Sequence, residues 1–143
     1  ITNTQSISSA ALVKRLASNG VKLNVTAILT LEQVSIIHDA LSPDTPAIVS
    51  VFAGRIADTG RDPIPIMTAA KALLSDQPKT ELLWASPREV LNIIQADQLG
   101  CDIITATPDI LKKLSKLDYD LERFSLDTVS MFYDDAKKAK YTL

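Results

Sequence analysis

The sequence of 143 residues contains one cysteine, one histidine and four glycines. Cys101 cannot form an internal disulfide bond, so a reducing compartment such as the cytoplasm is expected. His38 has no further ligands at metal-binding spacing, so no metal site is predicted and a structural or solvent-facing role is expected for it. The glycines do not form the Gly-x-Gly-x-x-Gly pattern of dinucleotide sites, and no phosphate-binding P-loop is present.

The sequence also lacks an excess of positive charge and a long apolar run. Its formal net charge is -2, which argues against a nucleic-acid or membrane-surface partner. No apolar run is long enough to span a bilayer, and the start does not resemble a signal peptide. The hydrophobic content of 46% is ordinary for a globular protein, and residues 1–143 are expected to form a single domain.

Strands and helices are predicted to alternate along the chain. The predicted strands are 21–28, 47–52, 81–85 and 102–106, and the predicted helices are 6–19, 30–41, 62–75, 86–100, 107–114 and 121–140. Val21, Leu23, Val25 and Ala27 are expected on one face of the first strand, and Lys22, Asn24 and Thr26 on the other. Thr30 to Gln33 and Ser86 to Glu89 have the spacing of capping boxes, which begin helices.

This alternation predicts βα units and a parallel sheet. Four units preceded by a helix fit either a small doubly wound sheet or part of a (β/α)8 barrel. Polar residues inside a strand, Asn24 and Thr26, suit a barrel interior better than a sheet covered on both faces. Residues 118–143 are expected to form a helical appendage within the domain. The start at Ile1 rather than Met, in a segment that resembles a strand end, favours a fragment of a larger protein over a trimmed terminus.

The residues after the second predicted strand form a candidate anion site. A loop with two arginines is predicted there, and Ser50, Gly54 and Arg55 could together offer a hydroxyl, backbone N–H groups and a guanidinium to a phosphate or carboxylate. The alternative is that Arg55 and Arg61 form surface ion pairs with nearby aspartates, and this is the expectation for Arg61. Asn24 and Thr26 could orient a substrate hydroxyl or a water, or simply bond to each other.

Three segments resemble the transaldolase family, which includes transaldolase and the fructose-6-phosphate aldolases. They are Leu23-Asn24-Val25-Thr26, Ser50-Val51-Phe52-Ala53-Gly54-Arg55-Ile56 and Gly100-Cys101-Asp102-Ile103-Ile104-Thr105. The resemblance covers nearly the whole chain. It implies a parallel (β/α)8 barrel of which this chain supplies the second half, from helix four through strand and helix eight, plus a C-terminal helix.

The resemblance implies Schiff-base chemistry without a metal or organic cofactor. A lysine amine attacks the carbonyl of a ketose phosphate, and a dihydroxyacetone unit is passed to an aldehyde or released. A cytoplasmic homo-oligomeric enzyme of carbohydrate metabolism, in the pentose phosphate pathway, is implied. By the same resemblance, Asn24 would hold the dihydroxyacetone hydroxyls, Thr26 the catalytic water and Ser50 the dihydroxyacetone unit, while Phe52 would shape the pocket and Arg55 would bind phosphate.

Two departures from the family pattern matter. The catalytic lysine is expected upstream of Ile1, in the N-terminal half of the same protein, so the 143 residues alone are expected to be inactive. Leu83-Trp84-Ala85 stands where the family often has a phosphate-binding Ser-Phe-Arg or Ser-Phe-Lys, which makes Arg88 the candidate for a second phosphate contact. The alternatives are a non-catalytic half-barrel module for sugar-phosphate binding or assembly, and another (β/α)8 enzyme that uses the Arg55 loop.

Overall fold

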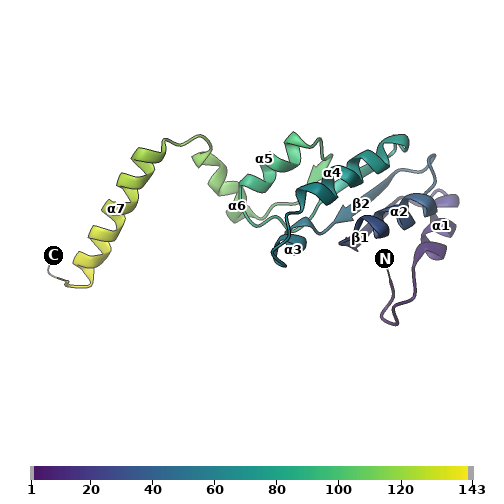
Figure 1. Cartoon of the computed structure of the whole chain (residues 1–143), viewed down its shortest axis with the longest axis horizontal. Helices are drawn as coiled ribbons and strands as arrows, with labels where there is room; N and C mark the ends of the chain where they lie inside the picture. Colours follow the sequence, from purple (N-terminus) through teal and green to yellow (C-terminus); the bar gives the residue numbers. More distant parts are fainter. Residues whose placement is uncertain (1, 142–143) are drawn as a thin grey trace. The chain divides into compact units, whose positions relative to one another are not determined.

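The computed structural model describes residues 2–141, which divide after Leu111 into two compact units. The first contains α1 (Ala10–Ser18), β1 (Leu23–Ile28), α2 (Leu31–Ala40), β2 (Ala47–Val51), α3 (Ala53–Ala57), α4 (Ile64–Leu73), the 3-10 turn η1 (Leu74–Asp76), β3 (Thr80–Trp84), α5 (Leu91–Gln98) and β4 (Ile103–Ile104) (Figure 1). Helix α6 (Pro108–Lys113) crosses the division, and η2 (Leu114–Lys116) and α7 (Leu121–Lys138) follow it.

The four strands form one parallel sheet in the order β1-β2-β3-β4. Each strand is joined to the next by a connection that contains a helix, as parallel pairing requires. The predicted α/β class with a parallel sheet is therefore confirmed, and the sheet is consistent with part of a (β/α)8 barrel.

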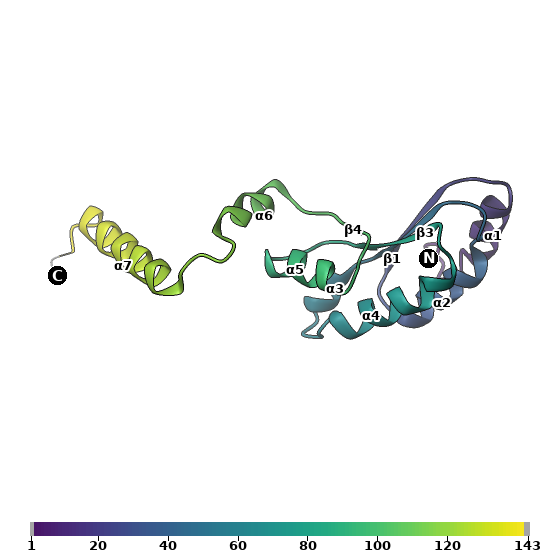
Figure 2. The ribbon, with the colours of Figure 1, turned by 90° about the horizontal axis from the view of Figure 1, so that it is seen from above.

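One face of this sheet is packed against helices, and α2 and α4 lie along it (Figure 2). The hydrophobic cluster between the two layers includes Val25, Val49, Val51, Leu82 and Trp84 from the strands and Val13, Ile37, Met67 and Ala96 from α1, α2, α4 and α5. Trp84 is completely buried there. Burial of this apolar surface is the main driving force for folding.

The opposite face of the sheet, called here the polar face, carries the alternate residues of the strands. It consists of Asn24, Thr26, Ile48, Ser50, Glu81 and Leu83. Three of them, Asn24, Thr26 and Glu81, are exposed, and Ser50 is only 3% exposed. The polar residues that the sequence places inside a strand therefore lie on the face that carries no helix layer.

Strand β1 departs from the predicted alternation near its end. Ala27 is exposed rather than on the core face, with a left-handed φ of 61°. Val25 pairs with Val49 but Ile28 pairs with Val51, so two residues of β1 oppose Ser50. This is a β-bulge, a feature that bends a strand and redirects its side chains.

One of the two predicted capping boxes is confirmed and the other is wrong. The Thr30–Gln33 box is present, with both reciprocal hydrogen bonds. The predicted helix start at Ser86 is wrong, because α5 begins at Leu91 and Ser86 has a left-handed φ of 60° that an N-cap does not adopt. The loop predicted after β2 also begins with a short helix, α3.

The second unit is dominated by α7, whose N-cap Asp120 accepts a hydrogen bond from the Arg123 N–H. None of the described residues of this helix is buried. Its exposed apolar side chains include Leu121, Leu126, Val129 and Phe132. Within residues 2–141, no helix is long and apolar enough to cross a membrane.

The predicted structural role of His38 is confirmed. Its Nε2 lies 2.8 Å from Asp76 Oδ1 and its Nδ1 lies 3.1 Å from Asp39 Oδ1, while its backbone carbonyl accepts a bond from Gln77 Nε2. These contacts join α2 to η1. Hydrogen bonding to Asp76, and then to Asp39, raises the pKa of His38 against the opposing effect of burial.

This raised pKa predicts a pH-dependent stability. The charged imidazole is stabilised in the folded state, so the contribution is complete below the unfolded pKa of about 6.5 and is lost as pH rises through the folded pKa. We expect Asp76→Asn to lower the free energy of unfolding by up to about 1 kcal/mol at pH 5.5 and by less at pH 8.5. Urea unfolding at both pH values measures this, and an equal or larger loss at pH 8.5 would contradict it.

Candidate functional site

The candidate site lies on the polar face of β1 and β2, with Thr26 and Ser50 toward the carboxyl ends of the strands and Asn24 near the start of β1. Asn24 stands in register with Ile48, and the β1 bulge brings Thr26 opposite Ser50. Asn24, Thr26 and Ser50 form no hydrogen bond through their side chains within the described residues, so an amide and two hydroxyls are available there. The structure therefore brings together the three polar residues that the sequence singles out on β1 and β2.

Arg55 reaches this edge from α3, which begins directly after β2. Phe52 is half-buried and continues the alternation of Ile48 and Ser50, and the Arg55 Cζ lies 5.2 Å from the centroid of its ring. A guanidinium over an aromatic face is held by a cation–π attraction and keeps its N–H donors for other partners. Arg55 is exposed and forms no ion pair among residues 2–141, so the alternative of a surface ion pair with a nearby aspartate is not formed there.

Helix α3 is held against the loop that follows β3 by a close backbone contact. The Gly54 N–H donates to the Ala85 carbonyl over 3.2 Å. A Cβ placed on Gly54 would lie 1.4 Å from the Ser86 carbonyl oxygen, so no residue with a side chain fits there without backbone movement. Gly54 is required by this approach and not by its backbone angles.

Asp58 and Arg88 add a second link between the same segments. Arg88 Nε donates to Asp58 Oδ1 over 2.9 Å, and Arg88 Nη2 donates to Asp58 Oδ2. The hydrogen bonds from Arg88 lower the pKa of Asp58 and raise the pKa of the guanidinium. The Asp58 carboxylate therefore pairs with Arg88, the candidate second phosphate contact, and not with Arg55 or Arg61.

Sequence reasoning missed Glu81 and the partner of Asp58. Glu81 is exposed on the polar face, where it stands in register with Ile48 beside Asn24. Together with Lys22, these three residues help line a cavity of about 370 Å³ near the amino ends of the strands. Strict alternation in β3 could have placed Glu81 on this face, whereas the partner of Asp58 depends on a contact between residues 30 positions apart.

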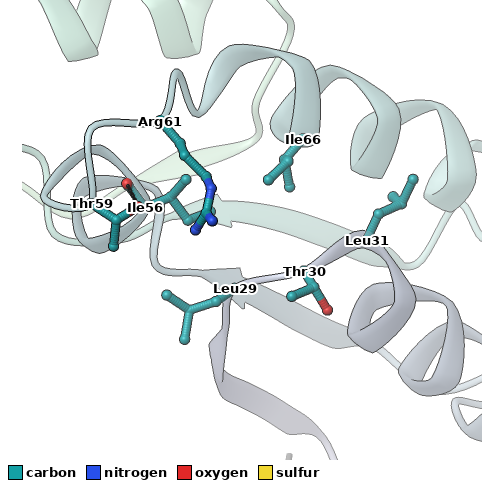
Figure 3. Close-up of a pocket in the computed structure, with 7 residues that line it drawn as sticks. All are labelled: Leu29, Thr30, Leu31, Ile56, Thr59, Arg61 and Ile66. Atoms are coloured by element: carbon teal, nitrogen blue, oxygen red, sulfur yellow. Dashed lines mark hydrogen bonds between the residues drawn. The ribbon is translucent and has the colours of Figure 1, made fainter.

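Arg61 lines a separate cavity of about 400 Å³ (Figure 3). Its neighbours there are Leu29, Thr30, Leu31, Ile56, Thr59 and Ile66, and its guanidinium points among them. The expected ion pair of Arg61 at a helix entry is not formed in the described part of the chain. The Asp62 carboxylate instead accepts a hydrogen bond from the Ile64 N–H at the start of α4.

Three other titratable groups near the sheet, Lys71, Asp102 and Cys101, have structural partners. Lys71 Nζ lies 2.6 Å from Asp102 Oδ1, and Asp102 Oδ2 accepts a bond from the Leu82 N–H. Burial alone would raise the pKa of Asp102, but these bonds together lower it. Cys101 is half-buried, and burial raises the pKa of its thiol. Residues 2–141 contain no group of three His, Cys, Asp or Glu side chains that could hold a metal ion.

The geometry defines an α/β protein with a parallel sheet, an uncovered polar face and an arginine at the carboxyl ends of its strands. A sequence model of the family described as Transaldolase/Fructose-6-phosphate aldolase matches residues 5–143. The chain therefore belongs to this family, and the resemblance drawn from its motifs is confirmed.

Individual relatives agree with this assignment. The chain is 30% identical over 129 residues to a probable transaldolase of Nitrosopumilus maritimus, an alignment that covers 89% of this chain and 54% of the relative. It is 32% identical over 120 residues to a probable transaldolase of Caldicellulosiruptor saccharolyticus and 31% identical over 119 residues to one of Methanococcus maripaludis, with 80% of this chain and 54% of the relative covered in each case. The chain spans about half the length of these curated relatives.

The contact at Gly54 predicts that replacing this helical glycine with alanine lowers the free energy of unfolding. Alanine is the better helix former, so propensity alone predicts that Gly54→Ala stabilises α3 by up to about 1 kcal/mol. Because the added Cβ meets backbone, we expect a loss of roughly 1–3 kcal/mol instead. Urea unfolding measures the difference, and a variant at least as stable as the wild type would show that the contact does not hold α3 in place.

Proposed function

We propose that this chain supplies the sugar-phosphate-binding part of a class I aldolase or transferase of the transaldolase type. The observation that carries the proposal is that Asn24, Thr26 and Ser50 share the polar face while Arg55 stands at the carboxyl end of β2. In parallel α/β folds, ligands bind at the carboxyl ends of the strands. Family membership supplies the reaction class.

The proposed roles follow from the chemistry of each group. The Asn24 amide and the Ser50 hydroxyl both donate and accept hydrogen bonds, as the hydroxyls and carbonyl of a dihydroxyacetone unit require. The Thr26 hydroxyl orients a water. The Arg55 guanidinium binds the phosphate through paired N–H donors and is oriented by its contact with Phe52.

The nucleophile of the proposed reaction is a lysine outside this chain. Its amine adds to the ketose carbonyl, water leaves, and the resulting iminium accepts the electron pair of the breaking carbon–carbon bond. None of the strands β1 to β4 contains a lysine, and Lys22, directly before β1, lies at the amino ends of the strands, at the opposite end of the sheet from Arg55. We therefore place the lysine before residue 1, and residues 1–143 act as a single domain that forms the second half of a (β/α)8 barrel.

A cytoplasmic location is part of the same proposal, as is assembly into a homo-oligomer. The family's reaction requires no metal or organic cofactor, because the iminium itself is the electron sink.

Trapping with borohydride tests the position of the nucleophile. We expect the 143-residue chain to form no covalent adduct when it is reduced in the presence of fructose 6-phosphate, as measured by intact mass. The product of the complete reading frame, treated in the same way, should gain one adduct on a lysine before residue 1. An adduct on any lysine within residues 1–143 would overturn the proposal, and substrate binding by the complete product without an adduct would favour a non-catalytic binding module.

Ligand titration tests the role of Arg55. We expect Arg55→Met to weaken binding of fructose 6-phosphate by about tenfold, because a charge-assisted contact is lost. Binding of unphosphorylated fructose should change little. Arg15→Met is the matched control, since Arg15 is an exposed arginine on α1. Equal effects of the two substitutions, or equal losses for both sugars, would show that Arg55 does not bind the phosphate.

A further inference from the structure

The Asp58–Arg88 pair is the second link between α3 and the β3–α5 loop. This pair indicates how Arg55 is held in position. Arg88 belongs to the loop after β3, whereas Asp58 is the C-cap residue of α3. Both oxygens of Asp58 accept hydrogen bonds from Arg88, one from Nε and one from Nη2. A two-point contact of this kind fixes orientation as well as distance.

Helix α3 needs such support because it has only five residues. Isolated helices of this length do not form in water, since nucleation costs more than so few hydrogen bonds return. The beginning of α3 is held by the Gly54 contact with Ala85 and Ser86, and its end is held by the Asp58–Arg88 pair. Arg55 lies between these two attachments, so its backbone position depends on both.

We propose that Arg88 is a positioning residue, which acts through Asp58 to hold α3 and thereby keeps the Arg55 guanidinium at the carboxyl end of β2. The inference rests on the proposed function, because it assigns Arg55 to the substrate phosphate. In this role Arg88 does not contact the phosphate directly, in contrast to the expectation from the sequence. The Nε and Nη2 groups of Arg88 donate their hydrogen bonds to Asp58 instead.

The charge of Asp58 makes the two roles of Arg88 distinguishable. The pKa of Asp58 is lowered mainly by the hydrogen bonds from Arg88 and, more weakly, by the charge of Arg55. A negative charge at this position repels a bound phosphate. If Asp58 had no positioning role, its removal would tighten phosphate binding, whereas a positioning role predicts the opposite.

Affinity for fructose 6-phosphate provides the first test. We expect Asp58→Asn and Arg88→Gln each to weaken binding by about two- to fivefold, the range of exposed ion pairs. Exchange of the two residues, Asp58→Arg with Arg88→Asp, should restore most of the affinity. Arg15→Gln is the control for loss of a positive charge. Tighter binding by Asp58→Asn together with weaker binding by Arg88→Gln would overturn the inference and assign Arg88 to the phosphate.

Amide hydrogen exchange provides a second test that needs no ligand. The N–H groups of Arg55 and Ile56 bond to the Phe52 carbonyl, and that of Asp58 bonds to the Gly54 carbonyl. We expect these amides to exchange several-fold faster in Asp58→Asn and in Arg88→Gln. The double variant in which the two residues are exchanged should regain their protection. The exchange rate of the Val49 amide in β2 should not change in any of these variants. Unchanged exchange in α3 would overturn the inference. Faster exchange without sugar-phosphate binding by the wild type would refute the proposed function and leave the positioning role intact.

Discussion

The backbone contact between Gly54 and Ser86 is the constraint on which the candidate site depends. A side chain at position 54 would place its Cβ 1.4 Å from the Ser86 carbonyl oxygen, so the two segments can approach only because Gly54 has none. This approach allows the Gly54 N–H to bond to the Ala85 carbonyl and brings Asp58 within reach of Arg88. The left-handed backbone of Ser86, with φ of 60°, belongs to the same junction. Residues with such angles often occur at functional sites.

The sheet and α3 contribute different parts of the site. The strands supply uncharged groups on the polar face, fixed by parallel pairing, and α3 supplies one guanidinium that no carboxylate neutralises among the described residues. Pairing of Asp58 with Arg88 leaves Arg55 as the cation at the carboxyl end of β2. Neutral groups for sugar hydroxyls and one cation for a phosphate are the requirements of a sugar-phosphate site.

Much of this arrangement could be predicted from sequence because it depends on local patterns. The parallel sheet follows from alternating strands and helices, and the polar face follows from Asn24 and Thr26 inside an apolar strand. The bulge at Ala27 and the late start of α5 could not be predicted, because sheet pairing and the loop after β3 override local propensity there. The Ser86–Glu89 spacing has the form of a capping box, but Asn92 instead accepts the N–H groups of Arg88 and Glu89. The partner of Asp58 lies 30 residues away and leaves no local signal.

The most direct test of the site is a map of amide chemical shifts in the isotope-labelled chain during titration with fructose 6-phosphate. The account predicts the largest changes at Asn24, Thr26, Ser50 and the residues of α3, and smaller changes when unphosphorylated fructose is used. Changes centred instead on Leu29, Arg61 and Ile66, which line the separate cavity, would contradict it.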